Sequence, residues 1–94
     1  MSIGTLRRLH AVVKGQVQGV GFRQFTLRQA REHNLTGWVR NRYDRSVEVV
    51  AEGQQDALDL FVAALRDGPP AAIVRSVDTR YETASGAFTD FDIR

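Results

Sequence analysis

An α+β sandwich with the element order βαββαβ is the fold class that the sequence predicts. Apolar and polar residues alternate in several short stretches, as they do in strands buried on one face. Between these stretches, apolar residues recur at helical spacing, most clearly from Gln54 to Asp67. Glycine and proline punctuate the 94 residues, and no repeat or linker interrupts them. We therefore expect a single domain over 1–94 with one modest core.

The first elements are a strand, a loop and a helix. The strand is expected from Leu6 to Lys14, because apolar side chains alternate onto one face there. These side chains are Leu9, Ala11 and Val13. A glycine-rich loop over 15–21 follows, and then a helix over 22–33 that ends at Asn34, a residue suited to a left-handed cap. The expected apolar stripe of this helix is Phe22, Phe25, Gln29 or Ala30, and His33.

Two strands over 37–43 and 46–52 are close enough in sequence to form a hairpin, joined at Asp44-Arg45. The first of these strands divides its side chains between two faces. One face carries Val39, Asn41 and Tyr43, and the other carries Trp38, Arg40 and Arg42. The inward residues of the second strand are Val47, Val49 and Ala51.

The remaining elements are a second helix and two strands. The helix stripe consists of Leu58, Phe61, Val62 and Leu65. The Gly68-Pro69-Pro70 break ends this helix, a strand follows over 73–82, and Phe91 and Ile93 alternate inward on a short last strand. The resulting order is the split βαβ arrangement, a ferredoxin-like sandwich. Its sheet is mostly antiparallel, two helices cover one face, and a short extra strand lies at the C-terminus. Many unrelated functions use this fold, so it does not decide the function.

The composition is that of an ordinary globular protein with a mild excess of positive charge. Hydrophobic residues make up 43% of the chain, and the net charge is +2, which suits an anionic ligand without requiring a nucleic acid. Lys14 is the only lysine, and arginine is better suited to bidentate capture of phosphate or carboxylate. The absence of cysteine excludes disulfides and a cysteine nucleophile. No apolar run is long enough for a transmembrane helix or a signal peptide, so we expect a cytoplasmic protein.

The stretch GQVQGVGFR (15–23) is a candidate anion site, because it joins a strand to the start of a helix. The first N–H groups of a helix have no internal partner and point outward with the positive end of the dipole. Gly15, Gly19 and Gly21 would let the backbone fold around an oxyanion, and Arg23 would close the cup with a charged fork. The spacing matches neither a Walker loop nor a dinucleotide fingerprint. A plain glycine-rich turn beside an exposed arginine is the alternative, and the motif alone leaves it open.

Asn41 is the second candidate residue. It shares a strand face with Val39, so it would point to the helix side of the sheet if Val39 packs under the helices. Arg23 lies on that same side, and the Asn41 carbonyl oxygen could hold a water near a bound phosphate. The alternative is an asparagine that bonds its own turn at the end of a strand.

Together, GQVQGVGFR and GWVRN (37–41) resemble the acylphosphatase family. The similarity extends to SVEVVAEG, the second helix, the Gly68-Pro69 break and the terminus at 91–94, and so covers nearly the whole chain. The resemblance implies a ferredoxin-like fold with an added edge strand. It also implies hydrolysis of acyl phosphates, which are carboxylic–phosphoric anhydrides, to carboxylate and inorganic phosphate.

The resemblance also implies which residues act. The phosphate would be held by backbone N–H groups of Gly15, Gln16, Val17, Gln18, Gly19, Val20, Gly21 and Phe22. Arg23 would bind the same phosphate, and Asn41 would orient the attacking water. The family uses no metal, no cofactor and no covalent phosphoenzyme. Inorganic phosphate is therefore expected as product and inhibitor.

One departure concerns the hairpin turn, where the family commonly has Asp-Gly and this chain has Asp44-Arg45. Loss of the glycine disfavours a two-residue turn that needs positive φ. We expect a longer or different connection, with Arg23 and Asn41 unaffected.

Two alternatives remain from the sequence. Trp38 and its neighbouring arginines on the outer sheet face are typical of RNA-binding domains of this fold, but 46–53 lacks the aromatics that such sheets use. The chain could also be a phosphate-binding module without turnover, like the acylphosphatase-like domains that begin large hydrogenase-maturation proteins. His10 and His33 lack a supporting cluster. We expect a monomer that binds neither nucleic acid nor membrane, and the sequence does not fix its natural substrate.

Overall fold

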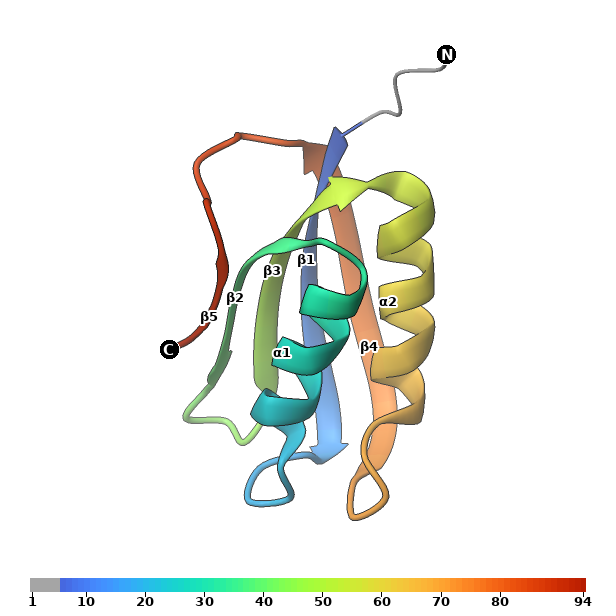
Figure 1. Ribbon diagram of the computed structural model, residues 1–94. Helices are drawn as coiled ribbons and strands as arrows, with labels where there is room; N and C mark the ends of the chain where they lie inside the picture. Colours follow the sequence, from blue (N-terminus) through green and yellow to red (C-terminus); the bar gives the residue numbers. More distant parts are fainter. Residues whose placement is uncertain (1–5) are drawn as a thin grey trace.

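The computed structural model describes residues 6–94 and has the predicted α+β sandwich fold (Figure 1). Its elements are β1 (Leu6–Gln16), α1 (Phe22–Glu32), β2 (Thr36–Asn41), β3 (Val47–Gln54), α2 (Gln55–Asp67), β4 (Ile73–Thr83) and β5 (Phe91–Ile93). The strands form one sheet in the order β4-β1-β3-β2-β5. Neighbouring strands are antiparallel except β2 and β5, which are parallel. The predicted ferredoxin-like order with a short C-terminal strand is confirmed.

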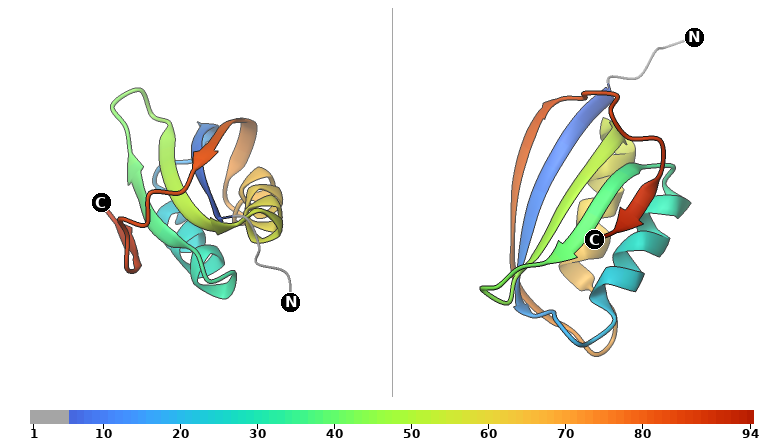
Figure 2. Two further views of the ribbon diagram at one scale, coloured as in Figure 1. Left: turned by 90° about the horizontal axis from the view of Figure 1, so that it is seen from above. Right: turned by 90° about the vertical axis from the view of Figure 1, so that its left-hand side faces the viewer.

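Both helices cover the same face of the sheet, so the molecule has two layers (Figures 1 and 2). α1 packs on β2 and β5, and α2 packs on β1, β3 and β4. The core lies between the layers, and its largest fully buried side chains include Leu9, Val13, Phe22, Val39, Val49, Leu58, Phe61, Leu65 and Phe91. Neither helix of the described chain is long and apolar enough to cross a bilayer.

The buried stripe of α1 differs from the predicted one. Phe22, Thr26 and Ala30 are buried at a spacing of four residues, whereas Phe25 and His33 are only partly buried. The Thr26 hydroxyl donates a hydrogen bond to the Phe22 carbonyl oxygen (2.9 Å), so its polar atom is satisfied inside the core. Hydrophobicity alone predicts that Phe25 is buried. Thr26 takes the core position instead, because its hydroxyl is hydrogen-bonded within the helix.

The hairpin between β2 and β3 also differs from the prediction. The strand expected over 37–43 ends at Asn41, because the chain turns at the next residue. The Arg42 N–H donates to Ser46 O (2.9 Å), and the Arg45 N–H donates to Arg42 O (3.2 Å). Arg45 has a left-handed backbone with φ of 73°. The connection is thus longer than a two-residue turn, as the missing glycine predicted.

The segment after β4 is fastened to the sheet by Glu52, which is only 5% exposed. The Glu52 carboxylate accepts hydrogen bonds from the Ser85 N–H and hydroxyl (2.9 and 2.7 Å) and from the Gly86 N–H (2.9 Å). Beyond this anchor, β5 runs beside β2, and the Arg94 N–H donates to Val39 O (2.8 Å). These contacts hold β5 at the edge of the sheet, where it also packs against α1.

Candidate active site

The β1–α1 loop (residues 17–21) ends in a helix N-terminus that no side chain caps. Gly21 is the N-cap residue, with φ of 79°, and the first turn of α1 contains no acidic residue. The Phe25 N–H is the first to bond within the helix, to Gly21 O (3.0 Å). Within residues 6–94, none of the backbone N–H groups of 18–24 donates a hydrogen bond to another backbone carbonyl or to a side chain. This row of free donors, with the positive end of the helix dipole, favours an anion.

Arg23 lies in that same first turn and is exposed to solvent. It forms no ion pair within the described part of the chain. A cation at the positive end of a helix is unfavourable for the helix alone. The position of Arg23 becomes favourable when an anion lies between the guanidinium and the free N–H groups.

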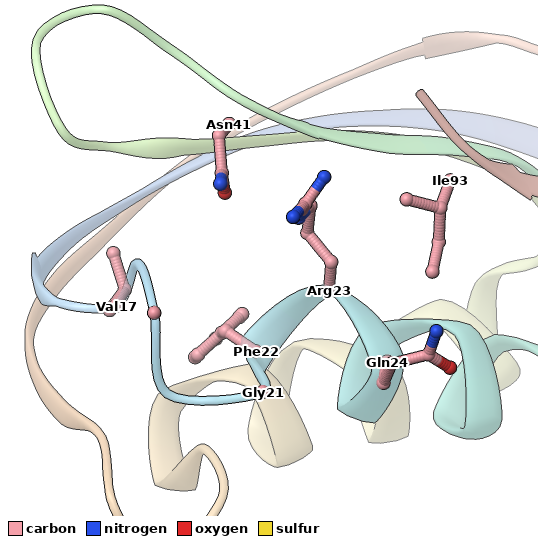
Figure 3. A pocket seen from close by; sticks show the side chains of 8 residues that line it. Val17, Gly21, Phe22, Arg23, Gln24, Asn41 and Ile93 are labelled. Carbon is pink, nitrogen blue, oxygen red and sulfur yellow. The ribbon is translucent and has the colours of Figure 1, made fainter.

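A cavity of about 340 Å³ lies between the start of α1 and the end of β2. Its lining consists of Val17, Gly19, Gly21, Phe22, Arg23, Gln24, Asn41 and Ile93. Figure 3 shows the Arg23 side chain rising from the helix toward β2, and the Asn41 side chain pointing down toward it. The two candidate residues therefore face the same space, although they come from different layers of the sandwich.

The Asn41 carbonyl oxygen has an unusual environment. Asn41 lies on the helix side of β2, as predicted from Val39, which is fully buried. Its Oδ1 atom is buried and has no hydrogen-bond partner in the described chain. A buried acceptor without a partner costs about 1–3 kcal/mol. The alternative that Asn41 bonds its own turn is therefore not observed.

The glycines of the motif differ in what they do. Gly19 and Gly21 have positive φ, and a Cβ on either would meet nothing within 4 Å, so their role is conformational. A Cβ on Gly15 would instead lie 2.1 Å from Ile73 O, because β4 approaches closely there. Gly15 and Gln16 belong to β1 and pair with β4, and they do not line the cavity. Of the residues predicted for the cup, Val17, Gly19, Gly21 and Phe22 line the cavity, whereas Gly15, Gln16, Gln18 and Val20 do not.

Gln24, Ile93 and the side chain of Gln18 have roles at or beside the cavity that the sequence does not predict, since Gln18 is expected there only for its backbone N–H group. Gln24 and Ile93 line it, and the Gln18 side chain bonds the hairpin turn, donating to Arg42 O (2.8 Å) and Ser46 O (2.9 Å). The sequence predicts Ile93 only as an inward residue of the last strand, because the parallel pairing of β5 with β2 has no local signal. Gln24 had a weak signal, since it follows Arg23 in the first turn of the helix.

The turn beyond Asn41 is held by Asp44. Its carboxylate accepts hydrogen bonds from the Ser46 hydroxyl and N–H. These bonds, from the hydroxyl first and the N–H second, lower the pKa of Asp44 below its usual value. The carboxylate is thus engaged in the turn, and no acidic side chain lines the cavity. In the described residues, no group of three His, Cys, Asp or Glu side chains is placed to hold a metal ion.

The sheet face away from the helices carries mostly paired charges. His10 Nε2 and Arg40 Nε each lie 2.7 Å from the Glu48 carboxylate. Burial raises the pKa of Glu48, but these two hydrogen bonds outweigh it and leave the pKa below its usual value. The Cζ atoms of Arg40 and Arg94 lie 5.3 and 5.2 Å from the centre of the Trp38 ring. Two arginine side chains therefore lie next to the indole on this face of the sheet.

A helix N-terminus with free N–H groups, an arginine and an amide oxygen around one cavity are typical of an enzyme site for a phosphoryl group. The sequence model of the family described as acylphosphatase matches residues 9–93. The chain is 48% identical to the acylphosphatase of Salinibacter ruber, over 100% of this chain and 99% of that one.

Two solved structures are similar throughout. The crystal structure of acylphosphatase from Bacillus subtilis has a TM-score of 0.91 and 38% identity, covering 94% of this chain and 98% of that one. The structure of an acylphosphatase from Coxiella burnetii has a TM-score of 0.91 and 35% identity, covering 100% of both chains. The chain belongs to the acylphosphatase family, and homology implies that it is a hydrolase with acylphosphatase activity.

Proposed function

We propose that the cavity binds the phosphoryl group of an acyl phosphate and hydrolyses the anhydride to a carboxylate and inorganic phosphate. The backbone N–H groups of the β1–α1 loop and the first turn of α1 hold the phosphoryl oxygens. Arg23 closes over the same group with a bidentate guanidinium. Support comes from one observation above all: the free N–H groups, Arg23 and the unpartnered Asn41 Oδ1 converge on one cavity.

Asn41 orients the attacking water in this proposal. Its Oδ1 accepts a hydrogen bond from the water and directs an oxygen lone pair at phosphorus. A new P–O bond forms while the bond between phosphorus and the acyl oxygen breaks, and the carboxylate leaves with the electron pair. The proton of the water passes to the phosphate or to the departing carboxylate. An amide is too weak a base to take it, so Asn41 acts by position.

The small inventory of groups fits this chemistry. Phosphoryl transfer through a loose transition state depends on positioning and charge stabilisation more than on a protein nucleophile. A carboxylate is already a good leaving group, so no strong general acid is needed. The site can therefore work with backbone N–H groups, Arg23 and Asn41.

Hydrolysis of benzoyl phosphate, followed by the loss of its absorbance, tests the proposal. We expect turnover that EDTA leaves unchanged and that inorganic phosphate inhibits competitively. Arg23→Ala is the negative control, because it removes a contact made in both the ground state and the transition state. A folded wild-type protein that binds phosphate without hydrolysing benzoyl phosphate would instead be a binding module.

A further inference from the structure

The Gln18 side chain joins the β1–α1 loop to the hairpin turn. A glutamine amide has two N–H donors, and both are used here. Nε2 lies 2.8 Å from Arg42 O and 2.9 Å from Ser46 O. Both acceptors are carbonyl oxygens, so the amide must present its nitrogen to them. The bridge is therefore unambiguous in its direction, from the loop to the turn.

The two acceptors lie directly beside Asn41. Arg42 follows Asn41 in the chain, and Ser46 precedes Val47, the residue that pairs with Asn41 across the ladder. Ser46 O also accepts the Arg42 N–H (2.9 Å), so its carbonyl takes part in two hydrogen bonds. Gln18 thus contacts the final bonded pair of the hairpin, immediately next to the amide that faces the cavity.

The turn is held by several hydrogen bonds, whereas the loop has few other supports. Asp44 fixes the turn through the N–H and hydroxyl of Ser46. In the loop, the surroundings of Gly19 and Gly21 are open, and the backbone N–H groups of 18–24 make no hydrogen bond to the described protein. The loop is therefore restrained by the buried Val17 side chain, by the Val20 side chain packed against the core, and by the Gln18 amide, which provides its hydrogen bonds to the turn.

We propose that Gln18 is a positioning residue, which sets the distance between the phosphoryl group held by the loop and the water held by Asn41. This inference rests on the proposed function. An attacking water must lie in line with the departing carboxylate, and a small displacement of one partner lowers the rate steeply. The Gln18 bridge makes the loop and the strand end move as one unit, so that alignment is set before substrate binds.

Gln18→Met is the first test, because methionine matches the length of glutamine but has no N–H donor. We expect kcat for benzoyl phosphate to fall roughly ten- to hundredfold. The inhibition constant of inorganic phosphate should change much less, since the loop N–H groups and Arg23 remain. Gln18→Asn, which is too short to reach both carbonyls, should show the same split if the methionine variant folds poorly. Unchanged kcat in a folded variant would overturn the proposal.

A double-mutant cycle with Asn41→Ala separates positioning from general support. If Gln18 acts through Asn41, Gln18→Met should have little effect on kcat once Asn41 is alanine. Equal fold losses in both backgrounds would show that Gln18 does not act through Asn41. The matched control is Gln55→Leu, which removes another glutamine hydrogen bond (Nε2 to Asp59 Oδ1, 2.9 Å) at the start of α2 and should leave kcat unchanged.

A measurement without turnover keeps the inference separate from the proposed function. The side-chain amide resonances of Asn41 in an NMR spectrum report its surroundings directly. Gln18→Met should shift or broaden them, whereas Gln55→Leu should not. If the wild type hydrolysed no acyl phosphate, the proposed function would fail and these resonances would still test the bridge. Unshifted Asn41 resonances in Gln18→Met would overturn the inference even in an active enzyme.

Discussion

A buried amide oxygen without a protein partner is costly, and Asn41 has one. The side chain is held at the end of β2, where its backbone pairs with Val47. A hydrogen-bonded water in the cavity would offset the cost, and such a water is the nucleophile of the proposed reaction. The unpartnered Oδ1 of Asn41 therefore lowers the stability of the protein but is the atom that the proposed hydrolysis requires.

We expect Asn41→Ala to lower kcat roughly a hundredfold while leaving the affinity for inorganic phosphate near that of the wild type. The free energy of unfolding should stay the same or rise by about 1 kcal/mol, because the variant removes an unsatisfied acceptor. Steady-state kinetics with benzoyl phosphate and urea denaturation measure the two effects.

Arg23 provides the contrast for that measurement. Arg23→Ala should lose both phosphate binding and turnover, and Arg23→Lys should also be damaging, because an ammonium cannot reproduce the planar fork. If Asn41→Ala weakened phosphate binding as much as Arg23→Ala does, the water-orienting role of Asn41 would be wrong.

The hairpin turn between β2 and β3 carries strain at Arg45. This residue has φ of 73°, a conformation that costs a non-glycine residue about 1–2 kcal/mol. The Asp44–Ser46 hydrogen bonds and the Gln18 bridge hold the turn in place despite that strain.

Arg45→Gly should therefore raise the free energy of unfolding by about 1 kcal/mol, because glycine adopts this conformation without strain. Urea denaturation at neutral pH measures the change. Arg42→Gly is the matched control: its backbone is not left-handed, so added flexibility should make that variant less stable. Destabilisation of both variants to the same extent would contradict the strain at Arg45.

Local sequence patterns were sufficient to predict most elements. The stripe of α2 and the alternation of β1 and β3 predicted buried faces correctly, and Asn34 has the expected left-handed backbone, with φ of 56°. The predicted end of β2 at residue 43 is wrong. The alternation of side chains continues in the sequence, but the hydrogen bonds of the turn already begin at Arg42. Patterns report which residues could be buried, and turn geometry decides where a strand ends.

Local sequence patterns also predict only part of the site. Arg23 and Asn41 carry motif signals, and the structure brings them to one cavity. The sequence places Gly15 in the loop. In the structure a side chain is excluded at this position because Ile73 O on β4 lies too close. The Gln18 bridge likewise joins residues that are distant in the chain. Such contacts leave no periodicity, so only the folded molecule reveals them.

The cavity is assembled from segments that meet only when the whole sandwich has formed. The β1–α1 loop, the first turn of α1 and the end of β2 provide the polar groups, and β5 adds Ile93 as a wall. β5 depends in turn on the anchor of the preceding segment at Glu52. Burial raises the pKa of Glu52, but hydrogen bonds from Ser85 and Gly86 and the charge of Arg8 outweigh it and hold the pKa below its usual value.

A carboxylate with a lowered folded-state pKa stabilises the fold above its unfolded pKa, and this stability is lost as the pH falls through the folded value. We therefore expect the free energy of unfolding to decrease below about pH 4.5, in part through Glu52. Glu52→Gln should be less stable at neutral pH and should lose less stability on acidification. Urea denaturation at a series of pH values tests this, with the exposed Glu82→Gln as control. The same acid dependence in Glu52→Gln and wild type would contradict the assignment.

Trp38 gives the molecule an internal optical reporter. It is the only tryptophan in the chain, and it lies on β2 with the Arg94 guanidinium close to its ring. Because Arg94 directly follows β5, detachment of that strand would remove a cation from beside the indole and would withdraw Phe91 from the core. Tryptophan emission therefore follows the edge of the sheet, whereas circular dichroism follows the helices. A difference between the two signals during acidification would reveal release of the cavity wall in a molecule that is otherwise folded.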